Sequence, residues 1–155
     1  MKINTSKFGA LDIDDKKIIS FENGILGFEN VNNYALLRIE ETLPFFWLQA
    51  IDNQDISLSC MNPFDIIPDY NPTVEQSALN ELQAEEGGDL LVLTTVVVPA
   101  EPIKATTNLA APIIINSKNN KGIQVILRDT QYNIKQPIFA KEEETRNVDT
   151  VKEAK

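Results

Sequence analysis

The sequence predicts a mainly β protein: a small antiparallel β-barrel-like domain with one or two short helices. Three observations support this prediction. The apolar runs are short and rich in β-branched and aromatic residues, they follow one another closely, and turn residues separate most of them. A chain of 155 residues is long enough to bury one core. We therefore expect a single domain over residues 1–140 and a polar, mobile C-terminal tail over residues 141–155.

Seven segments have the β-branched, aromatic or alternating apolar pattern of strands. In chain order they are Lys16–Phe21, Tyr34–Ile39, Phe45–Ile51, Ile56–Met61, Leu90–Val98, Ile113–Ile115 and Ile123–Leu127. The segment Leu90–Val98 is nearly all apolar, which is typical of a strand buried on both faces. Between the last two segments, Asn116–Gly122 has the composition of a hairpin loop.

One helix is predicted between the fourth and fifth strands. Asn71 is a suitable N-cap, Pro72 suits the first helical position, and Gly87-Gly88 is expected to end the helix. Its apolar residues fall on one face: Val74, Ala78, Leu79 and Leu82. Glu81 and Glu85 form a like-charge pair four residues apart near the C-terminus, where the helix dipole disfavours acids. Local helix stability therefore does not explain these charges.

The middle of the chain, from Ile39 to Ile103, contains no basic residue. It holds 12 of the 23 acids and none of the 14 Lys and Arg residues, so its formal charge is −12 in a chain of −9. This acidic interval argues against nucleic acid or an anionic membrane as a direct partner, and it favours a basic protein. The alternative is that the charge serves only solubility.

Residue types that are absent limit the possible chemistry. The chain has no His, which removes the commonest general base and metal ligand, and its single Cys60 lies in a strand-like run. Asp52 and Asp55 read as turn residues more than as cation ligands. We expect no enzyme activity, metal or cofactor, with a carboxylate-only enzyme as the remaining alternative. The N-terminus lacks a signal peptide and no apolar run could span a membrane, so we expect a cytoplasmic protein.

Two segments identify a family. The first is Ile19–Glu29, ISFENGILGFE, a corner in which Gly24 and Gly27 permit reversals between the aromatic residues Phe21 and Phe28. The second is Thr107–Asn116, TNLAAPIIIN, in which Pro112 opens a strand. With FFWLQ at 45–49, NPF at 62–64, QVIL at 124–127 and QPIF at 136–139, the chain resembles the flagellar assembly factor FliW family over its length before the tail.

The resemblance implies a function. Members of this family bind the carbon-storage regulator CsrA, a small basic RNA-binding dimer, and prevent it from repressing translation of flagellin mRNA. Flagellin is the competing partner. We therefore expect a non-enzymatic CsrA antagonist, with a dedicated flagellin chaperone as the alternative. The sequence leaves open whether the two partners share one surface, how RNA is excluded, the oligomeric state and the role of the tail.

Candidate partner-binding residues come from three segments. At the corner, Ile25 and Leu26 are either core residues or an exposed apolar tip, and we expect the exposed tip, which would suit flagellin. An aromatic residue and acids at the helix are expected to suit CsrA. The third segment is expected to be a surface loop. The residues are Ile25 and Leu26; Asp69, Tyr70, Glu75, Glu81 and Glu85; and Thr107, Asn108 and Leu109. Phe21, Gly24, Gly27, Phe28 and Pro112 are expected to be architectural.

Overall fold

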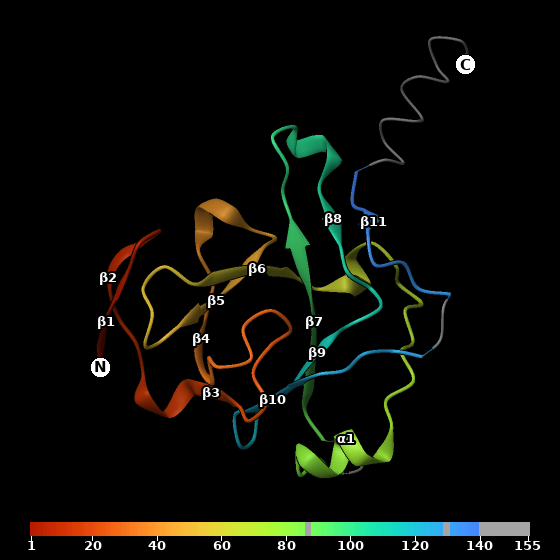
Figure 1. Cartoon of the computed structure of the whole chain (residues 1–155), viewed down its shortest axis with the longest axis horizontal. Coiled ribbons are helices and arrows are strands. Elements are labelled where there is room, and N and C mark those ends of the chain that lie inside the picture. Colours follow the sequence, from red (N-terminus) through yellow and green to blue (C-terminus); the bar gives the residue numbers. More distant parts are fainter. Residues whose placement is uncertain (86–87, 129–130, 140–155) are drawn as a thin grey trace.

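The computed structural model describes residues 1–85, 88–128 and 131–139, and Figure 1 shows their arrangement. The strands in these ranges are β1 (Lys2–Thr5), β2 (Gly9–Asp12), β3 (Ile18–Phe21), β4 (Asn33–Leu37), β5 (Phe46–Ala50), β6 (Ser57–Met61), β7 (Leu90–Val97), β8 (Thr106–Thr107), β9 (Ile113–Asn116), β10 (Lys121–Gln124) and β11 (Gln136–Pro137). The helices are α1 (Gln76–Glu81) and the 3-10 turns η1 (Asp15–Lys17), η2 (Glu40–Thr42), η3 (Pro63–Asp65) and η4 (Pro102–Lys104). The protein is mainly β, as predicted.

Seven of these strands close into a barrel. Hydrogen-bonded neighbours follow the order β3, β4, β5, β6, β7, β9 and β10, and β10 returns to β3. Every pair is antiparallel except β10–β3, which is parallel. Strands that alternate in direction around a ring require an even number, so a ring of seven must contain one parallel pair. The barrel prediction is confirmed, with this one departure from a purely antiparallel pattern.

The alternation of side chains across a strand explains why three consecutive isoleucines of β9 are all buried. Ile113 and Ile115 belong to the barrel interior, whereas Ile114 packs on the outer face beneath α1. β7 repeats this arrangement, with Leu93 inside and Val92 against the α1 cluster. The centre of β7 is therefore covered on both faces, as predicted. Its ends are not, because Leu90, Leu91 and Val97 are exposed.

The helix α1 is shorter than the sequence predicts, and the expected start at Asn71 is wrong. The Asn71 N–H donates to the Tyr132 hydroxyl at 2.9 Å, so Asn71 is tied to another segment and the helix starts only after Glu75. The helix ends at Glu81, before the expected end at Gly87-Gly88, and the carbonyl of its C-cap Leu82 accepts from Asn116 Nδ2 and Asn119 Nδ2, each at 3.0 Å. The predicted apolar face is confirmed for Ala78 and Leu82, which are buried with Val74 packed beside them, whereas Leu79 is only half-buried.

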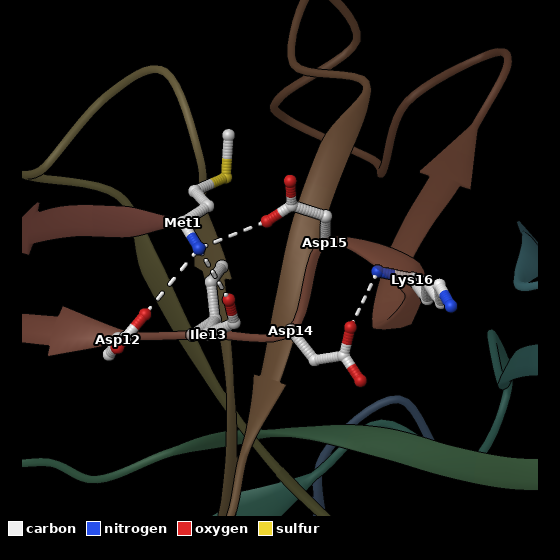
Figure 2. Close-up of polar contacts among 6 residues, drawn as sticks. All are labelled: Met1, Asp12, Ile13, Asp14, Asp15 and Lys16. Carbon is white, nitrogen blue, oxygen red and sulfur yellow. Dashed lines mark hydrogen bonds and ion pairs between the residues drawn. The ribbon is translucent and has the colours of Figure 1, made fainter.

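The hairpin β1–β2 stands beside the barrel and was missed by the sequence analysis. Figure 2 shows how the chain begins there: the Met1 amine lies 3.4 Å from Asp12 Oδ1 and 3.1 Å from Asp15 Oδ1. It also donates to the Ile13 carbonyl at 3.0 Å. These contacts, the hydrogen bond to Asp15 first among them, raise the pKa of the amine above its ordinary value.

The last described strands extend the sheet beyond the barrel. β8 pairs with the end of β7, and β11 pairs with β8. In the described part of the chain, no helix is long and apolar enough to cross a membrane. The expected tail, residues 141–155, and the boundary at residue 140 lie outside the described residues.

Candidate functional site

The corner between β3 and β4 is built around two glycines in left-handed conformations. Gly24 has φ +69° and Gly27 has φ +90°, values that disfavour other L residues. The Phe28 N–H donates to the Ile25 carbonyl at 2.6 Å, which closes a tight loop between the two residues. As a result the Leu26 side chain stands out at the tip, 61% exposed, whereas Ile25 turns inward and is 2% exposed.

Leu26 overhangs a groove between this corner and β10. Two adjoining hollows of about 200 and 410 Å³ share Glu81 and Gly122 in their linings. We call them together the corner groove, which is lined by Ser20, Glu22, Asn23, Gly24, Leu26, Glu29, Asn32, Glu81, Lys121, Gly122, Ile123, Gln124 and Ile126. Its residues come from β3, the corner, α1 and the segment around β10, which are distant in sequence.

Close packing fixes the floor of the corner groove. A Cβ atom at Gly122 would lie 2.5 Å from the Phe21 ring, so only glycine lets β10 approach β3 this closely. Gln124 ties the tip to the same strand, because its Oε1 accepts from the Leu26 N–H at 2.7 Å while its Nε2 donates to the Ala111 carbonyl at 3.1 Å. The tip is therefore held over the groove by β10.

Carboxylates surround the apolar part of the corner groove. Glu29 Oε2 accepts from the Gly27 N–H at 3.0 Å, and this backbone hydrogen bond lowers the pKa of the Glu29 carboxyl. Asn23 Nδ2 donates to Glu81 Oε2 at 3.5 Å and links the corner to α1. Glu22 lines the second hollow together with Glu81 and Lys121. An exposed apolar surface with negative charges around it suits a segment that carries apolar and basic side chains.

The apolar part consists of three aliphatic side chains. Leu26 is 61% exposed and Ile126 is 60% exposed, and the half-buried Ile123 of β10 lines the same hollow. Exposed leucines and isoleucines that gather in a hollow are typical of interaction sites. Sequence reasoning identified Leu26 and Glu81, but it missed Glu22, Glu29 and Ile126. Glu22 and Glu29 flank the corner itself and could have been proposed from that position.

The surface placement expected for several other residues is wrong. Ile25 belongs to the barrel core with Phe21 and Tyr34, so of its two readings the structure gives the core. Tyr70 is buried and its hydroxyl donates to the Leu109 carbonyl at 2.7 Å, while burial raises the pKa of that hydroxyl. The Tyr70 ring packs inside the protein, because burying an aromatic side chain of this size removes a large apolar area from water.

The segment 107–109 is not a surface loop. Thr107 lies in β8, buried, and shares a 2.7 Å hydrogen bond with Thr94 through their hydroxyls. Leu109 is also buried, and only Asn108 is partly exposed. Alternation along the extended chain accounts for this, since residues 107 and 109 point to the same side. A partner role for these residues remains a prediction, and Asn108 is the accessible one.

The predicted acids are exposed but do not form one site. Asp69 is exposed and precedes α1 in the chain. Glu75 Oε1 lies 4.0 Å from Arg128 Nη2, and Glu85 lines a separate hollow together with Asn119. Glu81 alone among them lines the corner groove. The eleven described acids of the interval Ile39–Ile103 are all exposed, and they are distributed from η2 through the β5–β6 turn, η3 and α1 to the loop after β7. The acidic interval of the sequence is therefore spread over the surface.

The side chains considered for chemistry have structural roles. Cys60 is buried in the barrel, and burial raises the pKa of its thiol to about 12. Asp52 and Asp55 lie in the turn between β5 and β6, as predicted, and Asp55 accepts a hydrogen bond from Ser6. Among the described ranges, no group of three or more acidic or Cys side chains is placed to hold a metal ion.

Comparisons with known proteins agree with this architecture. The sequence model of the FliW protein family matches residues 2–138. The flagellar assembly factor FliW of Thermoanaerobacter pseudethanolicus is 44% identical over 148 residues, which cover 95% of this chain and 97% of that protein. FliW of Treponema denticola is 39% identical over 140 residues, or 90% of this chain and 95% of that protein.

A solved structure gives the same result in three dimensions. The crystal structure of the flagellar assembly factor FliW superposes with a TM-score of 0.84 at 33% identity, covering 90% of this chain and 97% of that one. The chain belongs to the FliW family of flagellar assembly factors.

Proposed function

We propose that this flagellar assembly factor is a non-enzymatic antagonist of CsrA that relieves repression of flagellin translation, and that flagellin is its competing partner. The corner groove is the observation that carries the proposal. It offers an exposed Leu26 and Ile126 beside three carboxylates, Glu22, Glu29 and Glu81, against one cation, Lys121, which suits a basic protein that also presents apolar side chains. The family resemblance implies CsrA, a small basic RNA-binding dimer, as this basic partner.

One shared surface accounts for the competition. The apolar tip expected for flagellin and an acid expected for CsrA line the same groove, because α1 brings Glu81 next to the corner of Leu26. An amphipathic helix of flagellin would place its apolar face on Leu26 and Ile126. CsrA would place cations against Glu22, Glu29 and Glu81. A partner in the groove excludes the other by occupying the same side chains.

Exclusion of RNA follows from charge. Protein–RNA affinity depends strongly on phosphate contacts, and the chain carries a net charge of −9. When this protein is bound to CsrA, its carboxylates repel phosphates that approach nearby. The partners are made in the cytoplasm, and we place the protein there with them.

Competition between the partners tests the proposal. The purified full-length chain should bind CsrA and flagellin separately, and flagellin added to the CsrA complex should release CsrA. Fluorescence anisotropy of labelled CsrA follows this release. A complex that contains all three proteins would contradict the shared surface.

A translational reporter separates the antagonist from the flagellin chaperone. A reporter is fused to the flagellin leader mRNA. Its translation should fall when the gene for this protein is deleted, and a second deletion, of the CsrA gene, should restore it. A pure chaperone would leave the reporter unchanged and would alter only the lifetime of flagellin. That second result would favour the alternative function.

A further inference from the structure

One cation lies among the carboxylates of the corner groove. Lys121, the first residue of β10, lines the same hollow of about 410 Å³ as Glu22 and Glu81. With Glu29 in the adjoining hollow, the groove has three acids and this one base, so its formal charge is −2. Each carboxylate attracts a basic partner, whereas a cation repels it. Lys121 therefore opposes the binding that the other charges of the groove favour.

The fold directs Lys121 into the groove through the alternation of side chains along β10. Gly122 lies against the Phe21 ring of the barrel core, so the residues on either side of it face outward. Ile123 accordingly packs with the cluster beneath α1. The parallel register pairs Lys121 with Ser20 of β3, which lines the same hollow. As a result, Lys121 is half-buried at the wall of the hollow and is not part of the exposed loop before β10.

The charge of Lys121 is not neutralised by a close ion pair. Within the described ranges no carboxylate lies within 4.0 Å of its ammonium, whereas Lys104 Nζ lies 3.3 Å from Glu101 Oε1. Glu81, which lines the same hollow, accepts from Asn23 Nδ2 at 3.5 Å. Salt screens a charge in a recess less than one on the open surface. The ammonium therefore acts on any charged group that enters the hollow.

We propose that Lys121 determines which of two kinds of partner occupies the corner groove. This inference rests on the proposed function, in which a basic protein and an amphipathic segment compete for the groove. The ammonium repels the cations of the basic partner, but it does not alter apolar contacts with Leu26 and Ile126. Lys121 thus weakens one competitor selectively, and the amphipathic segment displaces that competitor at a lower concentration. Specificity commonly depends on such a repulsive element.

Charge substitutions at Lys121 in the full-length protein test the proposal. Lys121→Gln removes the ammonium and keeps a long polar side chain, whereas Lys121→Glu reverses the charge. We expect the affinity for CsrA to rise about two- to fivefold in the first variant, the range for one exposed charge pair, and to rise further in the second. The affinity for flagellin should change less. More flagellin is then needed to release labelled CsrA, which fluorescence anisotropy measures.

Lys118→Gln and Lys118→Glu are the matched controls. Lys118 lies in the loop before β10 and lines a hollow outside the corner groove, so these variants make the same change in net charge at a different place. Their affinity for CsrA should stay closer to that of the unchanged protein. Lys121→Arg keeps the charge and should bind both partners as the unchanged protein does. Urea unfolding midpoints establish that each variant is folded.

Two results would overturn the proposal while leaving the proposed function in place. Affinity for CsrA that is unchanged in Lys121→Gln would show that the ammonium does not act on the partner, and a fall would show that Lys121 binds a carboxylate of CsrA. Equal changes at positions 118 and 121 would show that only net charge acts. In both cases CsrA still binds. Failure of the proposed function is distinct, because the unchanged protein would then bind neither CsrA nor flagellin, and both claims would fall.

Discussion

The two glycines of the corner differ in what surrounds them, although both have a positive φ. A Cβ atom at Gly24 would lie 2.6 Å from the Glu29 Cα, whereas one at Gly27 would meet nothing within 4 Å. Gly27→Ala therefore costs only the left-handed backbone, about 1–2 kcal/mol. Gly24→Ala adds a clash with backbone that cannot rotate away, so we expect a larger loss and a displaced Leu26.

Urea unfolding checks this order. Both variants should lower the midpoint at an unchanged slope, Gly24→Ala more than Gly27→Ala. Equal midpoints would show that the corner relaxes freely and that its shape is not fixed by packing.

Two buried tyrosines allow the contribution of a buried hydroxyl to the free energy of unfolding to be measured. The Tyr70 hydroxyl donates to the Leu109 carbonyl, so Tyr70→Phe leaves a buried acceptor unpaired and should cost about 1–2 kcal/mol. The Tyr34 hydroxyl, also buried, has no hydrogen-bond partner among the described residues, and burial raises its pKa to about 12. Tyr34→Phe should therefore be neutral or stabilising, by up to about 1 kcal/mol. A thermal or urea unfolding series that gave equal losses would contradict this difference.

The sequence could identify the corner but could not decide between its two tip residues. Asn23-Gly24 and Gly27 are turn signals that can be read directly. Ile25 and Leu26 have similar hydrophobicity and neither helical nor strand periodicity applies in a turn. The bridge between Ile25 and Phe28, set by two positive φ angles, decides which side chain faces inward.

At the scale of elements, prediction succeeded where a segment is long and apolar and failed where tertiary contacts decide. The strands β3 to β7, β9 and β10 were each anticipated within a few residues. β8 and β11 are two-residue pairings that carry no sequence pattern of their own. Asn71-Pro72 has a genuine capping pattern, but the Tyr132 hydroxyl takes the Asn71 N–H and moves the helix start.

The N-terminal hairpin should respond to pH through the Met1 amine. Its pKa is raised in the folded state, so its contribution is complete below the ordinary value of about 8 and is lost as pH rises through the folded pKa. Asp15→Asn should lower the amine pKa, because the hydrogen bond to Asp15 is the largest cause of the shift.

Asp14→Asn is the control, since the Asp14 carboxylate accepts a hydrogen bond from the Lys16 N–H and not from the Met1 amine (Figure 2). Amine titration by NMR measures both variants. An equal shift in the two would mean that Asp15 has no special role.

Over the whole molecule, the fold distributes charge in a way that the sequence hides. The acidic interval from Ile39 to Ile103 supplies only Glu81 to the corner groove. Glu22 and Glu29, which join it there, lie outside the interval and follow the cations Lys16 and Lys17 in sequence. Counting charge along the chain predicted an acidic protein, but only the strand order could show which carboxylates meet.

Local charge should therefore matter more than net charge for binding CsrA. Glu22→Gln with Glu81→Gln removes two carboxylates from the corner groove. We expect slower association and a shallower salt dependence, because steering acts over a Debye length of about 8–10 Å. Glu40→Gln with Glu41→Gln makes the same change at η2, at the other end of β4, and should have a smaller effect. Stopped-flow rates that fall equally in both variants would show that only net charge acts.

The most direct test of the corner groove as the partner site is the affinity of Leu26→Asp for flagellin and for CsrA. Leu26 is 61% exposed, so the variant should fold, and loss of an interface anchor should weaken both partners by about 2 kcal/mol, roughly 30-fold. Val98→Asp, at an exposed apolar residue beyond β7, should leave both affinities unchanged. Titration calorimetry measures the affinity of each of the two variants for each of the two partners. Loss of one partner alone would contradict the shared surface, and unchanged binding of both to a folded Leu26→Asp would contradict the groove as the site.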